Sequence, residues 1–109
     1  MYKLDPGADT IGTTGMAEIE VPPAALVKRF GAPEEGDDYK VSGEYVFTDE
    51  DGRVFVVHDW KATNDWDPEF PSPAEYWASW EPDEIAISTK DVDARRFSEW
   101  LLAQLEQGE

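Results

Sequence analysis

Cysteine is absent from this chain of 109 residues. The absence excludes disulfides and thiolate metal sites, and it fits a reducing compartment such as the cytoplasm. Histidine occurs once, so a zinc site would have too few nitrogen and sulfur ligands. No apolar run approaches the roughly 18 residues of a membrane span, and the N-terminus lacks the basic and apolar regions of a secretion signal. We therefore expect a cytoplasmic protein that has no contact with membranes and uses no metal or cofactor.

Basic residues are scarce as well. Nine lysines and arginines stand against 25 aspartates and glutamates, which gives a formal net charge of −16. Residues 34–84 hold 16 of the acidic residues and 3 of the basic ones, so most of the excess lies in the middle of the chain. Such a charge opposes direct binding to nucleic acid or anionic lipid and favours a basic partner. A plain acidic domain adapted to a high-salt cytoplasm would have the same composition, and this alternative stays open.

Alternation of apolar and polar residues predicts a small antiparallel sheet. Its centre is a hairpin over residues 39–60, with an Asp-Gly turn in the segment TDEDG. Residues 17–21 and 84–89 alternate in the same way and predict two further strands. A short N-terminal helix is expected after the Pro-Pro pair, and an amphipathic C-terminal helix over residues 91–107, both packed on one face of the sheet. This order of elements is typical of an α+β fold.

The length predicts a single domain. Residues 1–15 are rich in glycine, threonine and aspartate and lack apolar periodicity, so we expect a flexible leader there and one α+β domain over residues 16–109. Residues 61–83 contain four prolines. They are expected to form a loop that holds a short helical turn capped by Ser72.

His58 is the first candidate for catalysis, but the surrounding sequence argues against it. Strand alternation places Asp59 on the opposite face, so the adjacent pair is not a catalytic dyad. No serine lies in the glycine-flanked turn that presents a nucleophile. We interpret His58 as a structural residue and expect no enzyme. Residues 64–69, NDWDPE, alternate oxygen ligands but lack the glycine and final glutamate of a calcium loop.

Aromatic and acidic residues are interleaved through residues 59–84. Aromatic rings are typical anchors of protein interfaces, and carboxylates around them would meet the lysines and arginines of a partner. A loop that wraps its own sheet, with a solvated acidic rim, would give the same pattern, and the sequence leaves both interpretations open. The residues expected to contact a partner are Asp59, Asp65, Trp66, Asp67, Glu69, Trp77, Trp80, Glu81 and Asp83.

A second candidate site lies at the start of the last helix, where Lys90, Arg95 and Arg96 form a basic cluster. The helix dipole favours an anion there, and aromatic rings would stack a nucleobase. The alternative is that these side chains pair with the acids one turn away. The cluster predicts, as an alternative function, the binding or sequestration of a small ligand such as a nucleotide.

The chain resembles small uncharacterised accessory proteins of bacteriophages and mobile elements over about residues 16–105. The resemblance lies in the segment GDDYKVSGEYVF and in the DWK that follows the hairpin. It implies an inhibitor of host defence, a class whose short, very acidic members often mimic DNA. Their carboxylates would imitate duplex phosphates, which lie about 1.7 Å apart along the helix axis. We therefore expect a non-enzymatic interaction protein that binds the basic surface of a nucleic-acid-binding protein, with its oligomeric state open and a homodimer included.

Overall fold

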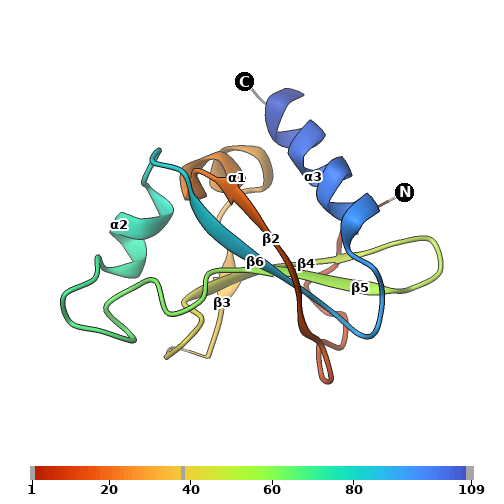
Figure 1. Cartoon of the computed structure of the whole chain (residues 1–109), viewed down its shortest axis with the longest axis horizontal. Helices are drawn as coiled ribbons and strands as arrows, with labels where there is room; N and C mark the ends of the chain where they lie inside the picture. The colour runs from red at the N-terminus through yellow and green to blue at the C-terminus, as the bar shows by residue number, and fades with distance from the viewer. Residues whose placement is uncertain (1, 38, 108–109) are drawn as a thin grey trace.

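The computed structural model describes residues 2–37 and 39–107, and residues 1, 38, 108 and 109 lie outside the description (Figure 1). The described strands are β1 (Lys3–Leu4), β2 (Thr14–Val21), β3 (Glu34–Glu35), β4 (Gly43–Thr48), β5 (Val54–His58) and β6 (Asp83–Thr89). The described helices are α1 (Pro23–Phe30), α2 (Pro73–Trp77) and α3 (Arg95–Gln107). The strands form one sheet in the order β1–β4–β5–β6–β2, and β3 pairs with the first residues of β4.

The α+β class and the small antiparallel sheet are confirmed. The central hairpin is shorter than residues 39–60, because regular pairing joins only β4 and β5, with Phe47 opposite Phe55. Its turn closes with a hydrogen bond from the Gly52 amide to the Asp49 carbonyl oxygen. The φ angle of Gly52 is 78°, a left-handed conformation that glycine adopts without strain. The Asp-Gly pair therefore sets the turn as the sequence predicts.

Two parts of the expected flexible leader, residues 2–4 and 14–15, are instead built into the fold. Lys3 and Leu4 pair with the end of β4 as the edge strand β1. The ring of Tyr2 lies 5.1 Å from the ring of Phe97, centroid to centroid. A strand of two residues has no periodicity to detect, and Tyr2 meets its partners through the tertiary fold alone. The expectation of a leader is therefore wrong for residues 2–4 and 14–15.

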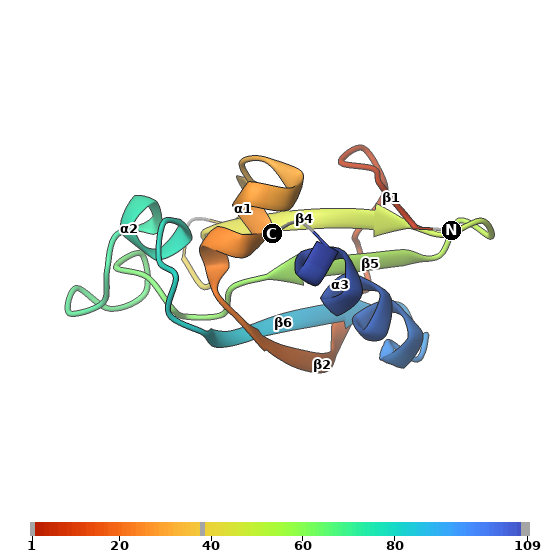
Figure 2. The ribbon, with the colours of Figure 1, turned by 90° about the horizontal axis from the view of Figure 1, so that it is seen from above.

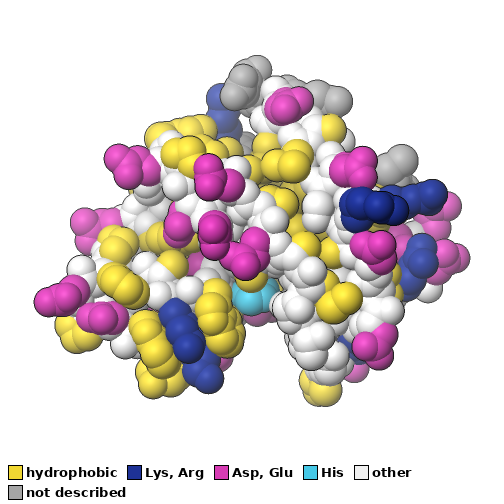
Figure 3. Space-filling view, viewed as in Figure 1, with side chains coloured by type: hydrophobic (Ala, Val, Ile, Leu, Met, Phe, Trp, Pro, Cys, Tyr) yellow, Lys and Arg dark blue, Asp and Glu magenta, His cyan; other side chains and the backbone are white. Residues whose placement is uncertain are grey.

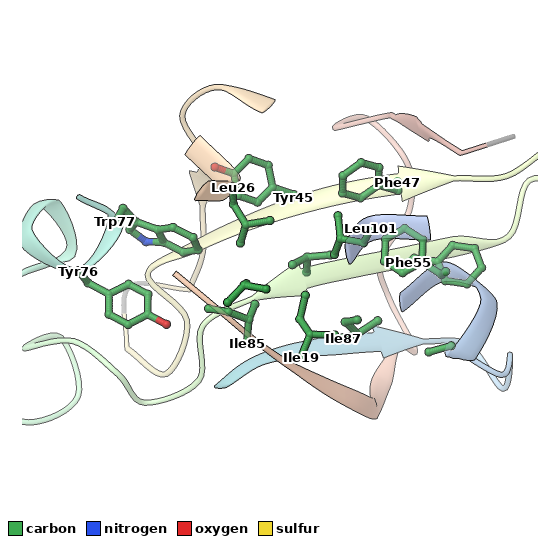
Figure 4. Packing of buried hydrophobic residues seen from close by; sticks show 14 residues of the cluster. Ile19, Leu26, Tyr45, Phe47, Phe55, Tyr76, Trp77, Ile85, Ile87 and Leu101 are labelled. Atoms are coloured by element: carbon green, nitrogen blue, oxygen red, sulfur yellow. The ribbon is translucent and has the colours of Figure 1, made fainter. Parts of the chain in front are cut away.

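One face of the sheet, which we call the closed face, is covered by α1 and α3 (Figure 2). Alternate side chains of β2, β4, β5 and β6 point to this face and form one cluster with Leu26 of α1 and with Phe97 and Leu101 of α3 (Figure 4). Phe97 stacks on Phe55 with ring centroids 4.7 Å apart. Each such buried side chain stabilises the fold by about 1.5–3 kcal/mol. This face therefore supplies most of the stability.

The helix α2 closes the core at one end of the sheet. Ser72 caps it reciprocally with Glu75, as the sequence predicts for the cap residue. Trp77 at its end is buried, and its indole N–H donates to Ser42 Oγ at 3.1 Å. A Cβ atom on Gly43 would lie 2.9 Å from Trp77 Nε1. Glycine at this position therefore allows the tryptophan to pack directly on β4.

Candidate functional site

The other face of the sheet, which we call the open face, carries the side chains that alternate with those of the core. Residues directly opposite one another in neighbouring strands point to the same face. One row of such pairs crosses the middle of the sheet from β3 to β2, through Glu34, Glu44, His58, Ala86 and Glu18. Three carboxylates and the histidine thus lie on one side of the sheet.

A groove with a volume of about 810 Å³ lies over the part of this row formed by His58, Ala86 and Glu18. Its floor comes from β5 and β6, its acidic lining from β2 and β6, and its aromatic lining from the loop that follows β5. Figure 3 shows the histidine at the inner, upper end of a notch that opens downward in this view, with acidic side chains above it and hydrophobic ones to its lower left. The polar and aromatic side chains that line it are Glu18, Asp83, Glu84, Trp60, Lys61, Phe70, His58 and Ser88.

His58 lies at the groove floor with both ring nitrogens engaged. Its Nδ1 lies 2.8 Å from the carbonyl oxygen of Asp59, which can only accept, so Nδ1 carries the proton. In the neutral ring, Nε2 then accepts from the hydroxyl of Ser88 at 2.9 Å. A catalytic base and a serine nucleophile form the same kind of hydrogen bond in enzymes that use covalent catalysis. However, Ser88 lies on an inner strand paired on both sides. Both ring nitrogens of His58 are thus used within the fold, and we retain the structural interpretation of His58.

Carboxylates oppose one another directly in two strand pairs. Glu20 faces Glu84 across β2 and β6, and Glu34 faces Glu44 across β3 and β4. The pKa of Glu84 is raised, first by its contact with the neighbouring carboxyl of Glu18 and by the charge of that group. The pKa of Glu44 is raised chiefly by burial, to which the charge of Glu34 adds. Like charges in such positions destabilise a sheet, so the open face holds electrostatic repulsion.

Aromatic rings form a patch beside the groove. The ring of Trp60 is half-exposed, and the ammonium groups of Lys40 and Lys61 lie 5.7 and 5.5 Å from its centroid. Lys61 also lies 4.5 Å from the ring of Trp66, which contacts Tyr39 at 4.9 Å between centroids. Cations are attracted to the faces of aromatic rings. Two of the few basic side chains of the central region are therefore held on tryptophan.

The residues expected to contact a partner divide into two groups. Asp59 is fully buried and Trp77 is 8% exposed, so the expectation is wrong for these two. The Asp59 carboxylate instead accepts from the amides of Ser42 and Gly43, at 2.9 and 3.1 Å, and ties β4 to the end of β5. Burial raises the pKa of Asp59, although these hydrogen bonds act in the opposite direction. The remaining residues are at least partly exposed: Asp65, Trp66, Asp67, Glu69, Trp80, Glu81 and Asp83.

The basic residues of the alternative site are exposed, but they do not meet the aromatic loop. The loop after β5 and the start of α3 lie at opposite ends of the sheet (Figures 1 and 2). The Nζ atom of Lys90 lies 3.8 Å from Oδ2 of Asp9. Among the ion pairs of residues 2–37 and 39–107, none involves Arg95 or Arg96. The expected nucleotide site, with rings and basic groups together, is therefore not assembled.

Three acids of the open face, Glu18, Glu20 and Glu84, were not among the site residues that the sequence predicted. The alternation that directs Ile19 and Val21 into the core also directs Glu18 and Glu20 outward together. That signal was present in the segment AEIEV. The direct pairing of Glu20 with Glu84 depends on strand register, which the segment alone does not reveal.

Metal and membrane roles gain no support from the geometry. In residues 2–37 and 39–107, no three histidine or acidic side chains converge as metal ligands. Across the same residues, no helix has the length and apolarity needed to cross a bilayer. The NDWDPE segment is a turn in which Asp67 Oδ1 accepts from the Glu69 amide at 3.0 Å.

No protein-family model matches the sequence, and no curated protein is significantly similar to it. The site is therefore interpreted from its geometry.

Proposed function

We propose that the protein is a non-enzymatic, acidic interaction protein whose open face binds the basic surface of a nucleic-acid-binding protein. The observation that supports this most directly is the like-charged pairing of Glu20 with Glu84 and of Glu34 with Glu44. Opposite charges at these positions would make a more stable sheet. Departures from local stability are expected where a surface serves a function. Cations of a partner would relieve this repulsion.

The spacing of the carboxylates suits an extended cationic surface. Neighbouring strands lie about 5 Å apart, and alternate residues along one strand lie about 7 Å apart. Glu18, Glu20 and Glu84 therefore form a compact array beside the groove. Several lysines or arginines that normally contact phosphates would meet such an array at once. This is the physical basis of the proposed phosphate mimicry.

Inhibition follows from this mode of binding. A nucleic-acid channel occupied by the acidic face has no room for nucleic acid, so the partner loses its activity. In the setting that the resemblance to bacteriophage accessory proteins implies, the partner is a host defence protein. The exposed acids of the loop after β5, Asp65, Asp67 and Glu69, would extend the contact.

The experiment that tests this function is capture from a lysate of the source cell, or of its host, on immobilised protein at low salt. We expect a basic protein that elutes as NaCl rises towards about 1 M, because screening shortens the range of surface charges. We also expect elution by duplex DNA, which competes for the same channel. A partner retained at high salt and in excess DNA would contradict phosphate mimicry.

A further inference from the structure

The outer edge of β2 is a second surface of the acidic region. The strand spans eight residues, ends the strand order of the sheet and pairs with β6. No other backbone hydrogen bond to residues 14–21 is found in the described part of the chain. An unpaired strand edge presents free N–H and C=O groups, and these form a template for an added strand.

The side chains of β2 define what an added strand would meet. Ile19 and Val21 are buried on the closed face, whereas Met16, Glu18 and Glu20 are exposed. An added strand would place alternate side chains about 5 Å from Glu18 and Glu20 on the open face. Positively charged side chains there would also screen the repulsion between Glu18 and Glu84. The edge thus combines unpaired backbone groups with a row of carboxylates.

A second copy of the chain fits this edge poorly. In an antiparallel pair centred on Ile19, Glu18 of each copy would oppose Glu20 of the other. Like charges directly opposite one another destabilise the pairing. Acidic and identical strands are therefore disfavoured, whereas a strand with alternating cations is favoured.

We propose that the outer edge of β2 binds an extended segment of the partner as an added strand, with lysine or arginine at alternate positions facing Glu18 and Glu20. Backbone hydrogen bonds hold the segment, and the carboxylates select its sequence. The inference rests on the proposed function because it requires a basic partner. To that function the inference adds the mode of binding, which is strand addition, and the spacing of the basic residues along the partner's segment.

A synthetic peptide tests the inference directly. The probe is an eight-residue peptide that alternates threonine and lysine, matched in length to β2. Its binding is measured by fluorescence anisotropy at low salt, and the β2 amides are followed by hydrogen exchange. We expect binding with protection of β2 amides. A peptide of the same composition with its four lysines contiguous should bind roughly tenfold more weakly, because its charges do not alternate.

Backbone methylation separates strand addition from simple charge attraction. Successive amides of a strand point to opposite edges, so two versions of the peptide are methylated on alternate sets of amides. We expect one version to lose binding and the other to retain it, and the version that loses binding reports the strand direction. If both versions bind as well as the parent peptide, strand addition is wrong, although attraction to a basic partner still stands.

A charge-reversed variant provides the matched control. Glu18→Lys combined with Glu20→Lys replaces the repulsion of Glu20 and Glu84 by attraction, so the fold is expected to be retained and is checked by circular dichroism. This variant should prefer a threonine–glutamate peptide to the threonine–lysine one. An unchanged preference would overturn the inference, as would a wild-type dimer whose β2 amides are protected. The proposed function itself is contradicted by a different result, namely a captured partner whose binding does not weaken as salt rises.

Discussion

The two faces of the sheet are built on opposite principles. On the closed face, helices cover the strands and Phe97 contacts the rings of Phe47 and Phe55 inside one cluster. On the open face, a groove remains and carboxylates lie opposite carboxylates. One set of strands thus supports both stability and electrostatic repulsion. The closed face therefore supplies most of the core, while the open face combines a small buried cluster of Val46, Val54 and Val56 with an accessible groove.

The largest expected effect comes from breaking the closed face. Phe97→Ala removes a fully buried ring and leaves a cavity, so the free energy of unfolding should fall by about 3–5 kcal/mol. The matched variant Phe70→Ala removes a ring that lines the groove and is 41% exposed, with an expected loss below about 1 kcal/mol. Urea unfolding measures both. Equal losses would show that the two faces do not differ in this way.

A smaller loss is expected at the contact between β4 and α2. Gly43→Ala places a methyl group against Trp77 and Pro33, and overpacking of this kind costs about 1–3 kcal/mol. Gly15→Ala, on the groove side, meets open space and should change the unfolding midpoint little. Thermal unfolding of the two variants compares them. A Gly43→Ala variant that unfolds at the wild-type temperature would mean that Trp77 can move away without loss of stability.

Stability should also depend on pH. The pKa values of Glu44, Asp59 and Glu84 are raised in the folded protein. Their contribution to stability is therefore fully present below their unfolded pKa values, near 4, and is lost as pH rises through the folded values. The pKa values of Asp37 and Asp49 are lowered. The contribution of these two groups is present above about 3.8 and is lost as pH falls through their folded values.

The two trends together predict a higher melting temperature at about pH 5 than at pH 7, and a decline in stronger acid. Thermal unfolding at constant ionic strength measures this. The variant that combines Glu18→Gln with Glu84→Gln should show a smaller rise, because it lacks the repulsion that acid relieves. A melting temperature that is flat or falls between pH 7 and pH 5 would contradict the electrostatic account of the open face.

Local patterns predicted the hairpin, the α+β class and the capped turn at Ser72, because these depend on neighbouring residues. They did not predict the role of Tyr2, whose ring meets Phe55 and Phe97 through tertiary packing. Asp59 is instructive in another way. Strand alternation placed it on the face opposite His58, and in the structure that face is the core side, where Asp59 is buried. Its assignment to an interface came from the composition of the surrounding segment, which does not reveal the direction of one side chain.

The candidate site was predicted in its general character and missed in its location. Acidic and aromatic residues around residue 60 were recognised, and Trp60 and Phe70 do line the groove. The array of Glu18, Glu20 and Glu84 was not anticipated, because it joins two strands that are distant in the sequence. Register between such strands is set by the whole fold, and a single segment does not contain that information.

The most direct test of the central claim compares two variants that remove the same charge from opposite faces. Glu18→Gln with Glu84→Gln neutralises two acids of the open face, and Glu99→Gln with Glu106→Gln neutralises two exposed acids of α3. Each variant is titrated against the captured partner by calorimetry at low salt. We expect the open-face variant to bind roughly tenfold or more weakly, and the α3 variant to bind like the wild-type protein. Equal losses of affinity in both variants, or none in either, would contradict a binding role of the open face.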